Sequence, residues 1–299
     1  MYTYEYTTLQ ELADVARQHG ITLSEAALRH ETETSERTVE EVRETMAERL
    51  VVFHESIKSG LEDTGKSVSG LVGGDAAKMA AKGPRLLGTA AHKAATYAVA
   101  INEANAKMFK IVACPTAGSC GILPAAVIAV AETEGFTDND CINPLFTAAG
   151  IGAVVARNAS VAGAVGGCQA ECGSAAAMAA AAVAELMGGT NDEVLQAFAL
   201  AMKNILGLAC DPVAGLVEVP CVKRNGVFAV IALTAAEMAL AGVRSVIPPD
   251  EVIAAMDEIG RLLPVSLKET ADGGLAKTET GKAIAERLSA EVEKSKYSL

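Results

Sequence analysis

Small apolar residues dominate this sequence, and they restrict the possible fold more than any other feature. Residues 173–186 read GSAAAMAAAAVAEL, and 51% of the chain is hydrophobic whereas only 4% is aromatic. Small side chains let helices approach one another closely, and alanine is the strongest helix former. Alternating patterns typical of strands are scarce, with weak indications only at 111–114 and 217–219. We therefore predict a mainly α fold built as an Ala-rich multi-helix domain.

Helical periodicity, broken by glycine, proline and polar residues, divides the chain into segments. Residues 1–63 are strongly charged and predict two short helices, the second starting near Thr22, and then a longer one from about 35 to 59. We expect them to form an N-terminal cap on a helical catalytic domain of residues 64–299, with a separate small domain as the alternative. Further helices are expected from near 75 and at 86–109, 124–134, 138–157, 171–187, 191–207, 225–242, 249–263 and 278–294.

Charge and cysteine usage exclude several classes of protein. A net charge of −12 disfavours binding to nucleic acid or to anionic membranes. The odd number of cysteines, 7 in all, disfavours a disulfide framework and favours reduced thiols in the cytoplasm. The acidic first residues predict no secretory signal. The charge-free run 111–131 is interrupted by glycine and proline, so we expect a buried junction of loop and helix there, not a membrane span.

Three cysteines stand where glycine or proline interrupts the helical pattern. These are Cys168 in GGCQAECGS, Cys210 in ACDPVAG and Cys221 in VEVPCVKRN. Three thiolates can hold a cubane iron–sulfur cluster and leave its fourth iron open as a Lewis acid. We therefore predict that these Gly/Pro-marked loops carry an iron–sulfur site used in catalysis. The alternative for each cysteine is that it serves only as a small buried hydrophobe, and the spacing matches no compact metal motif.

Other cysteines leave the ligand set open at this point. Cys172 lies four positions after Cys168, so the two thiols could share a helix face and bind a metal together. Cys172 could equally fill a small apolar position in the Ala-rich helix. We expect Cys114 and Cys120 near the site because they flank PTAGS, and we expect Cys141 to be a packing residue.

The segment PTAGSCG, residues 115–121, is typical of a loop that binds an anion ahead of a helix. Hydroxyl groups and free backbone amides there could hold a carboxylate, although a plain turn with a helix cap would look the same. Isolated polar residues elsewhere in apolar surroundings are candidates for orienting a small polar substrate, or for capping helices. The predicted substrate-binding residues are Ser69, Asn105, Thr116, Gly118, Ser119, Asn158 and Arg224.

The chain offers no obvious general base. Its histidines are His19, His30, His54 and His92. The first three lie in the charged N-terminal part, His92 lies on a predicted helix, and none shows the spacing of a metal motif. We therefore expect structural roles for all of them.

The motifs SGLVGGDAAKM, NEANAKM, PTAGSCGILPA, GGCQAECGSAAAMAAAA, KNILGLACDPVAGLVEVPCVKRN and DGGLAKT identify a family. On these residues the chain resembles the alpha chain of the bacterial iron–sulfur-dependent L-serine dehydratases over nearly its whole length. The ligand cysteines of that family correspond in context and order to Cys168, Cys210 and Cys221. The resemblance therefore implies a [4Fe-4S] cluster bound by these three residues, without Cys172.

The resemblance also implies a reaction. The open iron binds L-serine through its carboxylate and β-hydroxyl, a base removes the Cα proton, and elimination leads to pyruvate and ammonia without pyridoxal phosphate. In this family the enzyme is one fused chain or a pair of chains, and the partner portion carries a Ser-Ser-His-Thr motif that is missing here. We thus expect an L-serine dehydratase beta chain to complete the site, in a heterodimer or a higher assembly. The expected setting is amino-acid catabolism and gluconeogenesis.

Three alternative functions stay open at the level of sequence. The first is a related cluster-dependent enzyme that removes sulfide from L-cysteine. The second is a non-catalytic iron–sulfur redox sensor or electron carrier, which would need a fourth protein ligand such as Cys172. The third is a structural subunit without a cluster. Assays of serine against cysteine, and iron and sulfide analysis, distinguish these alternatives.

Overall fold

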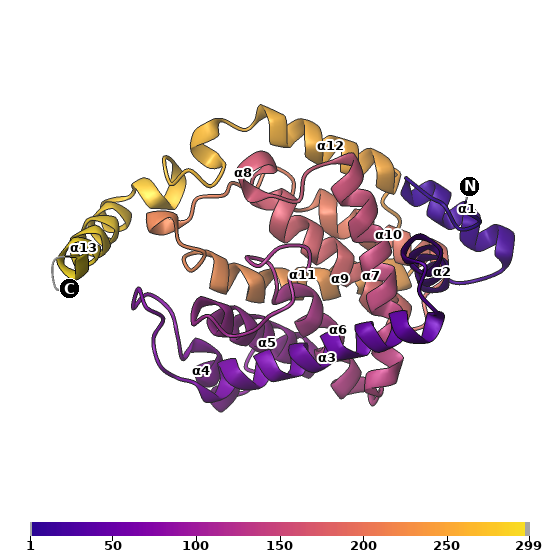
Figure 1. Cartoon of the computed structure of the whole chain (residues 1–299), viewed down its shortest axis with the longest axis horizontal. Coiled ribbons are helices and arrows are strands. Elements are labelled where there is room, and N and C mark those ends of the chain that lie inside the picture. The colour runs from indigo at the N-terminus through magenta and orange to yellow at the C-terminus, as the bar shows by residue number, and fades with distance from the viewer. Residues whose placement is uncertain (1, 297–299) are drawn as a thin grey trace.

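The computed structural model describes residues 2–296 as a bundle of helices joined by loops (Figure 1). Residues 297–299 of the predicted 64–299 domain lie outside the described residues. The mainly helical prediction is confirmed, because no strand occurs in residues 2–296 and the one isolated β-bridge pairs Cys210 with Lys268. The strand indications were wrong. Residues 111–113 are irregular and 217–219 form a turn, since neither segment has a neighbouring strand with which to pair.

The predicted helices are confirmed, with ends shifted by a few residues. The α-helices are α1 (Leu9–His19), α2 (Leu23–Ser35), α3 (Val39–Glu62), α4 (Asp75–Lys82), α5 (Thr89–Ala106), α6 (Ile122–Glu134), α7 (Asp138–Asn158), α8 (Gly163–Gly166), α9 (Ser174–Leu186), α10 (Asn191–Lys203), α11 (Cys221–Leu240), α12 (Pro249–Leu262) and α13 (Glu279–Lys296). The four-residue helix α8 was not predicted, and neither were four short elements of other types. They are the π-helix η1 (Gln169–Gly173) and the 3-10 helices η2 (Val213–Gly215), η3 (Val265–Leu267) and η4 (Gly274–Lys277).

Threonine residues determine where several helices begin. Thr8, Thr38, Thr137 and Thr190 each form a capping box with an acidic residue three positions later. In this motif the threonine hydroxyl accepts a backbone N–H of the first turn, and the acidic side chain accepts the N–H of the threonine. The predicted start near Thr22 is likewise confirmed, because its hydroxyl accepts the N–H of Glu25 at the start of α2.

Helix α9 is the centre of the bundle. All residues from Ser174 to Ala184 are buried, and α9 packs against α6, α7, α10 and α11 (Figure 1). Alanine places only a methyl group between neighbouring helix backbones, so these four helices can surround α9 closely. The amino end of α9 continues directly from η1, which begins just after Cys168. The best-packed helix therefore leads into the cysteine-bearing segment.

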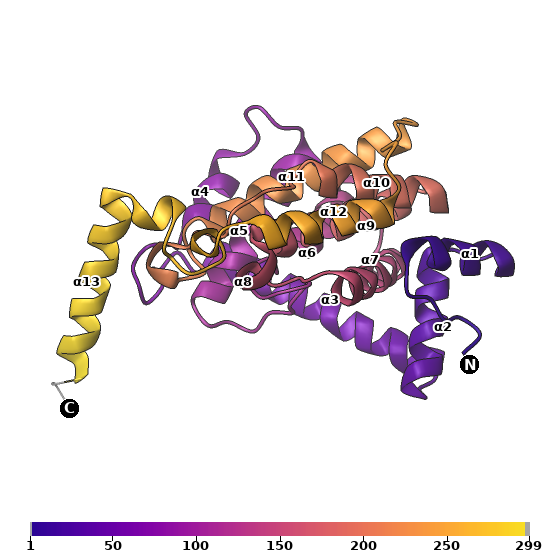
Figure 2. The same ribbon diagram turned by 90° about the horizontal axis from the view of Figure 1, so that it is seen from above.

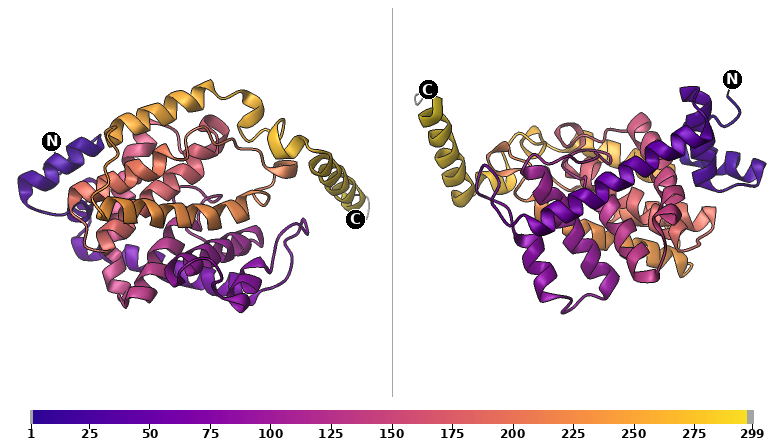
Figure 3. Two further views of the ribbon diagram at one scale, coloured as in Figure 1. Left: turned by 180° about the vertical axis from the view of Figure 1, so that it is seen from behind. Right: turned by 60° about the horizontal axis from the view of Figure 1, so that its bottom comes forward.

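The N-terminal helices pack onto this bundle. Helix α3 carries buried residues at helical spacing, among them Val42, Met46, Leu50, Phe53 and Ile57. It crosses the body diagonally in the right-hand view of Figure 3 and contacts α5 and α7. Residues of α1, α2 and α3 belong to the same hydrophobic cluster as those of α9. The division at residue 63 stays a prediction.

Helix α13 projects from the side of the molecule and points away from the bundle in Figure 2. Its packing partners are the short elements η2 and η4, and its Arg287 donates to the carbonyl oxygen of Ser69 at 3.1 Å. Most of its side chains are exposed. The core around α9 is thus built without α13.

The charge-free run 111–131 forms the loop before α6 and most of α6 itself, where every residue from Ile122 to Ala131 is buried in protein. This confirms the predicted junction of loop and helix. None of the helices in the described part of the chain has the length and apolar character needed to cross a membrane.

Candidate metal centre and substrate site

Three separate segments bring the predicted ligand cysteines into the interior. Cys168 directly precedes η1, Cys210 lies in the loop after α10, and Cys221 is the first residue of α11. All three are buried, with exposed fractions of 1%, 3% and 5%. The chain turns sharply ahead of Cys168 at Gly167, whose φ of +77° favours glycine and where a Cβ would lie 2.6 Å from Leu263 Cδ1. Cys168 is therefore placed by a turn that few other residues could form.

The loop that carries Cys210 is held by backbone pairing with residues 267–269. The N–H of Cys210 donates to the carbonyl oxygen of Leu267 at 2.9 Å, and the N–H of Glu269 donates to the carbonyl oxygen of Cys210 at 2.8 Å. These two bonds fix the backbone on both sides of the thiol. They also bring Glu269, which follows η3, next to Cys210.

The thiol of Cys168 is the centre of a polar group. Hydrogen bonds with the thiols of Cys172 and Cys210, together with the nearby Arg224 guanidinium, lower the pKa of Cys168 far below its ordinary value. Burial raises the pKa of the Cys221 thiol to about 12, and the negative charge at Cys168 adds to this rise. The three predicted ligands are therefore close enough to influence one another's ionisation, and Cys168 is the one that favours the thiolate.

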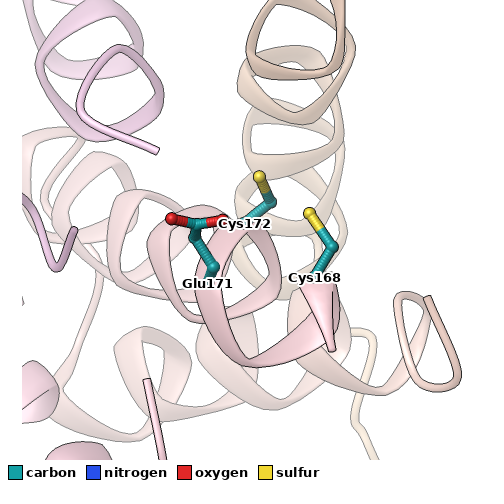
Figure 4. Close-up of side chains that lie close together, drawn as sticks. All are labelled: Cys168, Glu171 and Cys172. Carbon is teal, nitrogen blue, oxygen red and sulfur yellow. The ribbon is translucent and has the colours of Figure 1, made fainter. Parts of the chain in front are cut away.

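The structure also groups Cys168 with Cys172 and Glu171. One ligand atom from each of these side chains lies within 4.8 Å of the others, and all three are buried. Figure 4 shows them projecting from the same side of η1. This is a possible metal-binding Cys/Glu group, and it keeps Cys172 in question as a ligand. The exclusion of Cys172 thus still rests on the family resemblance alone.

Arg224 lies on the first turn of α11 and braces the Cys210 loop. Its guanidinium donates to the carbonyl oxygen of Ala209 at 3.0 Å and to Asp211 Oδ1 at 3.2 Å. The same side chain contacts the Cys168 thiol. Arg224 thus connects two of the predicted ligand segments and places a positive charge beside the thiols. This position is compatible with its predicted role in substrate binding and adds a second role in holding the thiol site together.

The PTAGS loop is tied to the start of α11 by amide side chains. Asn225 donates to the carbonyl oxygens of Gly118 at 2.8 Å and Cys221 at 2.9 Å, and it accepts the N–H of Gly121 at 3.1 Å. Asn105 of α5 donates to the carbonyl oxygen of Ala117 at 3.1 Å. Asn105 therefore orients the loop backbone, and Asn225 links this loop to Cys221.

One hydroxyl group of the loop, that of Thr116, already bonds a carboxylate of the chain itself. Thr116 donates to Glu171 Oε1, and its oxygen lies 3.1 Å from that of Ser119. The backbone at Gly118 closes on the same group, because a Cβ there would lie 2.5 Å from Glu171 Oε1. The sequence predicts that Thr116 and Ser119 bind the carboxylate of a substrate. The structure gives the Thr116 hydroxyl a different acceptor.

Glu171 is the central residue that the sequence analysis missed. Its exposed fraction is 9%, and burial raises the pKa of its carboxyl to about 7. The hydrogen bond from Thr116 lowers this pKa, whereas the negative charges of Cys168 and Glu269 raise it further. A charged residue inside the small-residue segment GGCQAECGS was the available signal. Glu269 gave no such signal, since it lies in a polar segment that reads as an ordinary loop.

The backbone of Gly163, the first residue of α8, packs closely against these groups. A Cβ on Gly163 would lie 2.9 Å from Cys210 Sγ, 3.4 Å from Glu269 Oε2 and 3.5 Å from Glu171 Oε2. A thiol and two carboxylates from three different segments thus meet beside residue 163, where a side chain would collide with Cys210 Sγ.

Two predicted substrate residues are engaged in other contacts. The Ser69 hydroxyl donates to Glu218 Oε2 at 2.6 Å, beside the Ser67 hydroxyl at 2.7 Å from the same oxygen. Asn158 donates to the carbonyl oxygens of Thr7 at 2.7 Å and Val154 at 3.0 Å, which ties the end of α7 to the N-terminal segment. These contacts give structural roles to both residues and do not support a role in substrate binding.

The histidines lie outside this group of thiols and carboxylates. His19 and His30 stack on Tyr4 and Tyr6, and His54 Nε2 lies 3.1 Å from Asp138 Oδ1. His92 lies in the first turn of α5 and donates its backbone N–H to the carbonyl oxygen of Gly88. Within residues 2–296, no hydrogen bond or ring contact joins a histidine to a predicted ligand cysteine.

Comparison with known proteins decides the family. The family model described as serine dehydratase alpha chain matches residues 18–276. The chain belongs to the serine dehydratase alpha chain family. It is 47% identical over 286 residues to the probable L-serine dehydratase alpha chain of Bacillus subtilis, which covers 95% of both chains. It is 42% identical over 280 residues to the L-serine dehydratase alpha chain of Peptoniphilus asaccharolyticus, covering 93% of this chain and 96% of that one.

A longer family member shows a different chain organisation. The L-serine dehydratase of Streptomyces coelicolor is 40% identical over 281 residues, which cover 91% of this chain but 61% of the Streptomyces protein. The family's catalytic chain thus occurs both at the length of the present chain and as part of a longer polypeptide. The family assignment made from the motifs is confirmed.

Proposed function

We propose that this chain is the alpha chain of an L-serine dehydratase, a lyase that converts L-serine to pyruvate and ammonia. The observation that carries the proposal is the convergence of buried thiols, Arg224 and the PTAGS loop at the ends of the helices around α9. Relatives named L-serine dehydratase alpha chain, at 42% and 47% identity over nearly the whole length, support it.

The donor set fits the [4Fe-4S] cluster that the family resemblance implies. Cys168, Cys210 and Cys221 offer buried sulfur ligands, and Cys168 favours the thiolate form in which cysteine binds iron. Arg224 offsets part of the negative charge that thiolate ligands add. A side chain at residue 163 would collide with Cys210 Sγ, so glycine is needed for this close approach. We propose that these three cysteines hold the cluster, and that Cys172 fills a packing position behind it.

When bound, such a cluster supplies an iron without a protein ligand, which acts as a Lewis acid on the leaving hydroxyl group. The residues of the chain then have to bind and orient the serine. We propose that the PTAGS loop with Glu171 forms the polar wall of the substrate site. Thr116 and Gly118 lie against the Glu171 carboxylate, and the Ser119 hydroxyl lies 3.1 Å from that of Thr116. Asn105 and Asn225 hold this wall in place against α11.

The base that removes the Cα proton is proposed to come from a second polypeptide, the beta chain. The histidines of the present chain are engaged elsewhere, and the Streptomyces relative contains a substantial additional portion. General acid–base catalysis contributes roughly 10²- to 10⁴-fold to a rate, so the isolated alpha chain should turn over serine poorly.

An anaerobic reconstitution tests the proposed function. The purified chain is loaded with ferrous iron and sulfide, mixed with its beta chain, and assayed for pyruvate from L-serine, L-threonine and L-cysteine. We expect pyruvate from L-serine, dependent on both iron and the beta chain. Sulfide release from L-cysteine without turnover of L-serine would reassign the chain to the desulfidase class.

A further inference from the structure

Helices α2, α3 and α7 border a cavity that is separate from the thiol site. It has a volume of about 270 Å³ and lies where the three helices contact one another (Figure 1). Its floor is apolar and is formed by the buried side chains of Val42, Met46 and Phe146. The cavity is smaller than the roughly 300–1,000 Å³ of sites for drug-sized molecules. It therefore suits a small ligand with an apolar part.

Tyr6 and His30 line this cavity, and their polar atoms have no partner in the protein. The two rings stack with their centroids 4.7 Å apart. Within residues 2–296, neither the Tyr6 hydroxyl nor a ring nitrogen of His30 makes a hydrogen bond, and His30 Nδ1 is buried as well. Tyr6 is only 7% exposed. A polar group at such low exposure costs free energy unless a ligand or water bonds it.

The rim of the cavity carries opposite charges that do not pair with each other. Arg49 of α3 and Glu31 of α2 both line it and are exposed, yet the charged group of neither makes a hydrogen bond or ion pair with any residue that the structure describes. Burial raises the pKa of the Tyr6 hydroxyl and the negative charge of Glu31 raises it further, so these two groups lie close together. Arg37, the other cation of the rim, already donates to Thr45 Oγ1 at 2.6 Å.

We propose that this cavity binds a free α-amino acid with a small apolar side chain. Arg49 binds the carboxylate, Glu31 binds the α-ammonium group, and the side chain of the ligand lies on the apolar floor. The Tyr6 hydroxyl provides a further donor for the carboxylate. A ligand held in this way contacts α2, α3 and α7 together, so it stabilises the packing of the N-terminal helices on the bundle. The inference does not depend on the function proposed above.

Calorimetry on the anaerobically reconstituted full-length chain tests the proposal, with L-alanine, L-valine, L-leucine and L-methionine as probes. We expect saturable binding of at least one of them and a rise in melting temperature on its addition. The deaminated acid and the amide of the tightest-binding probe are then compared with it. Each should bind at least about tenfold more weakly, because each leaves one charge of the rim without its hydrogen-bonded partner.

Substitutions locate the binding. Arg49→Gln and Glu31→Gln should each weaken binding about tenfold. Their controls, Lys58→Gln and Glu48→Gln, change exposed charges of α3 that do not line the cavity and should bind as the wild type does. Ala153→Leu enlarges an exposed side chain that lines the cavity and should abolish binding. Circular dichroism and the melting temperature without ligand show that each variant is folded.

A thiol-site variant separates this cavity from the proposed substrate site. Cys210→Ser should bind the amino acid as the wild type does, since residue 210 does not line the cavity. Binding that is lost in Cys210→Ser but kept in Arg49→Gln would overturn the proposal and assign the ligand to the thiol site. No saturable binding of any of the four probes would also overturn it. A deaminated acid that binds as tightly as its amino acid would overturn it in favour of a simple carboxylate site.

Discussion

The helices around α9 are apolar and closely packed, whereas the segments that carry the thiols are polar and irregular. In α9, alanine side chains are fully buried and need no polar partners. At the thiol site, a π-helix and two glutamates lie together, and one of these, Glu269, is a non-glycine residue with positive φ. Features of this kind cost free energy and are frequent at functional sites. The comparison teaches that an apolar, closely packed bundle supports a polar site that would not be stable alone.

Substitution of the proposed cysteine ligands should have the largest effect, and it should affect the thiol site without affecting the helical bundle. Cys168→Ser, Cys210→Ser and Cys221→Ser should each abolish cluster binding and serine turnover while the helical content is kept, because serine is nearly isosteric with cysteine but binds iron poorly. Iron and sulfide analysis with circular dichroism measures both effects. Cys141→Ser, which changes a buried thiol in α7, is the matched control. Wild-type iron content in the Cys210→Ser protein would refute the assignment.

A Cys172 variant tests whether this fourth thiol is also a metal ligand. Cys172→Ser should leave the iron content near that of the wild type, because we assign its thiol to packing beside Cys168 and not to the cluster. Loss of iron in this variant would show instead that the group of Cys168, Glu171 and Cys172 is the metal site.

The PTAGS loop should show a smaller effect that is confined to substrate. The double variant Thr116→Ala/Ser119→Ala removes the one hydrogen bond from these hydroxyls to the Glu171 carboxylate. A hydrogen bond to a charged group is worth about 1.5–3 kcal/mol, so we expect serine affinity to fall about 10- to 150-fold. The cluster spectrum should not change. Thr234→Ala, which removes an exposed hydroxyl of α11, is the control. Unaltered kinetics in the double variant would reduce the loop to a plain turn.

A substitution in the core around α9 should lower the free energy of unfolding and leave the thiol site unchanged. Ala180 is fully buried in α9, so Ala180→Leu forces additional methylene groups between helices and should cost about 1–3 kcal/mol of unfolding free energy. The same change at the exposed Ala283 of α13 should have little effect. Urea unfolding measures the difference. An Ala180→Leu protein as stable as the wild type would contradict the close packing around α9.

The smallest expected effect is on the pH dependence of stability, through the buried carboxyl of Glu185. Burial raises the pKa of Glu185, which accepts hydrogen bonds from Ser24 and Thr147. A raised pKa in the folded state means that the folded protein binds this proton more tightly, so stability falls as pH rises from about 4.5 through the folded pKa. Glu185→Gln should therefore gain stability relative to the wild type at about pH 8 and lose this advantage near pH 5, as measured by urea unfolding. A difference independent of pH would contradict it.

Local sequence patterns predicted the helices and the loops that carry the thiols. They did not predict which distant segments meet at the site. Threonine caps, alanine runs and the glycine and proline breaks act over a few residues, so α6, α7 and α12 were predicted within a few positions. Contacts between distant segments have no local signature. The pairing of Cys210 with residues 267–269 brings Glu269 to the site, and only the fold shows it. The Thr116–Glu171 hydrogen bond was missed for the same reason.

The central claim is that three cysteines hold a catalytic cluster with one iron open to substrate. Electron paramagnetic resonance of the anaerobically loaded and reduced enzyme, recorded before and after adding L-serine, tests it most directly. We predict that L-serine changes the spectrum, because the substrate becomes a ligand or close neighbour of the open iron, and that Cys172→Ser responds in the same way. A fully loaded cluster whose spectrum is identical with and without saturating L-serine would contradict the account and favour a redox centre with four protein ligands.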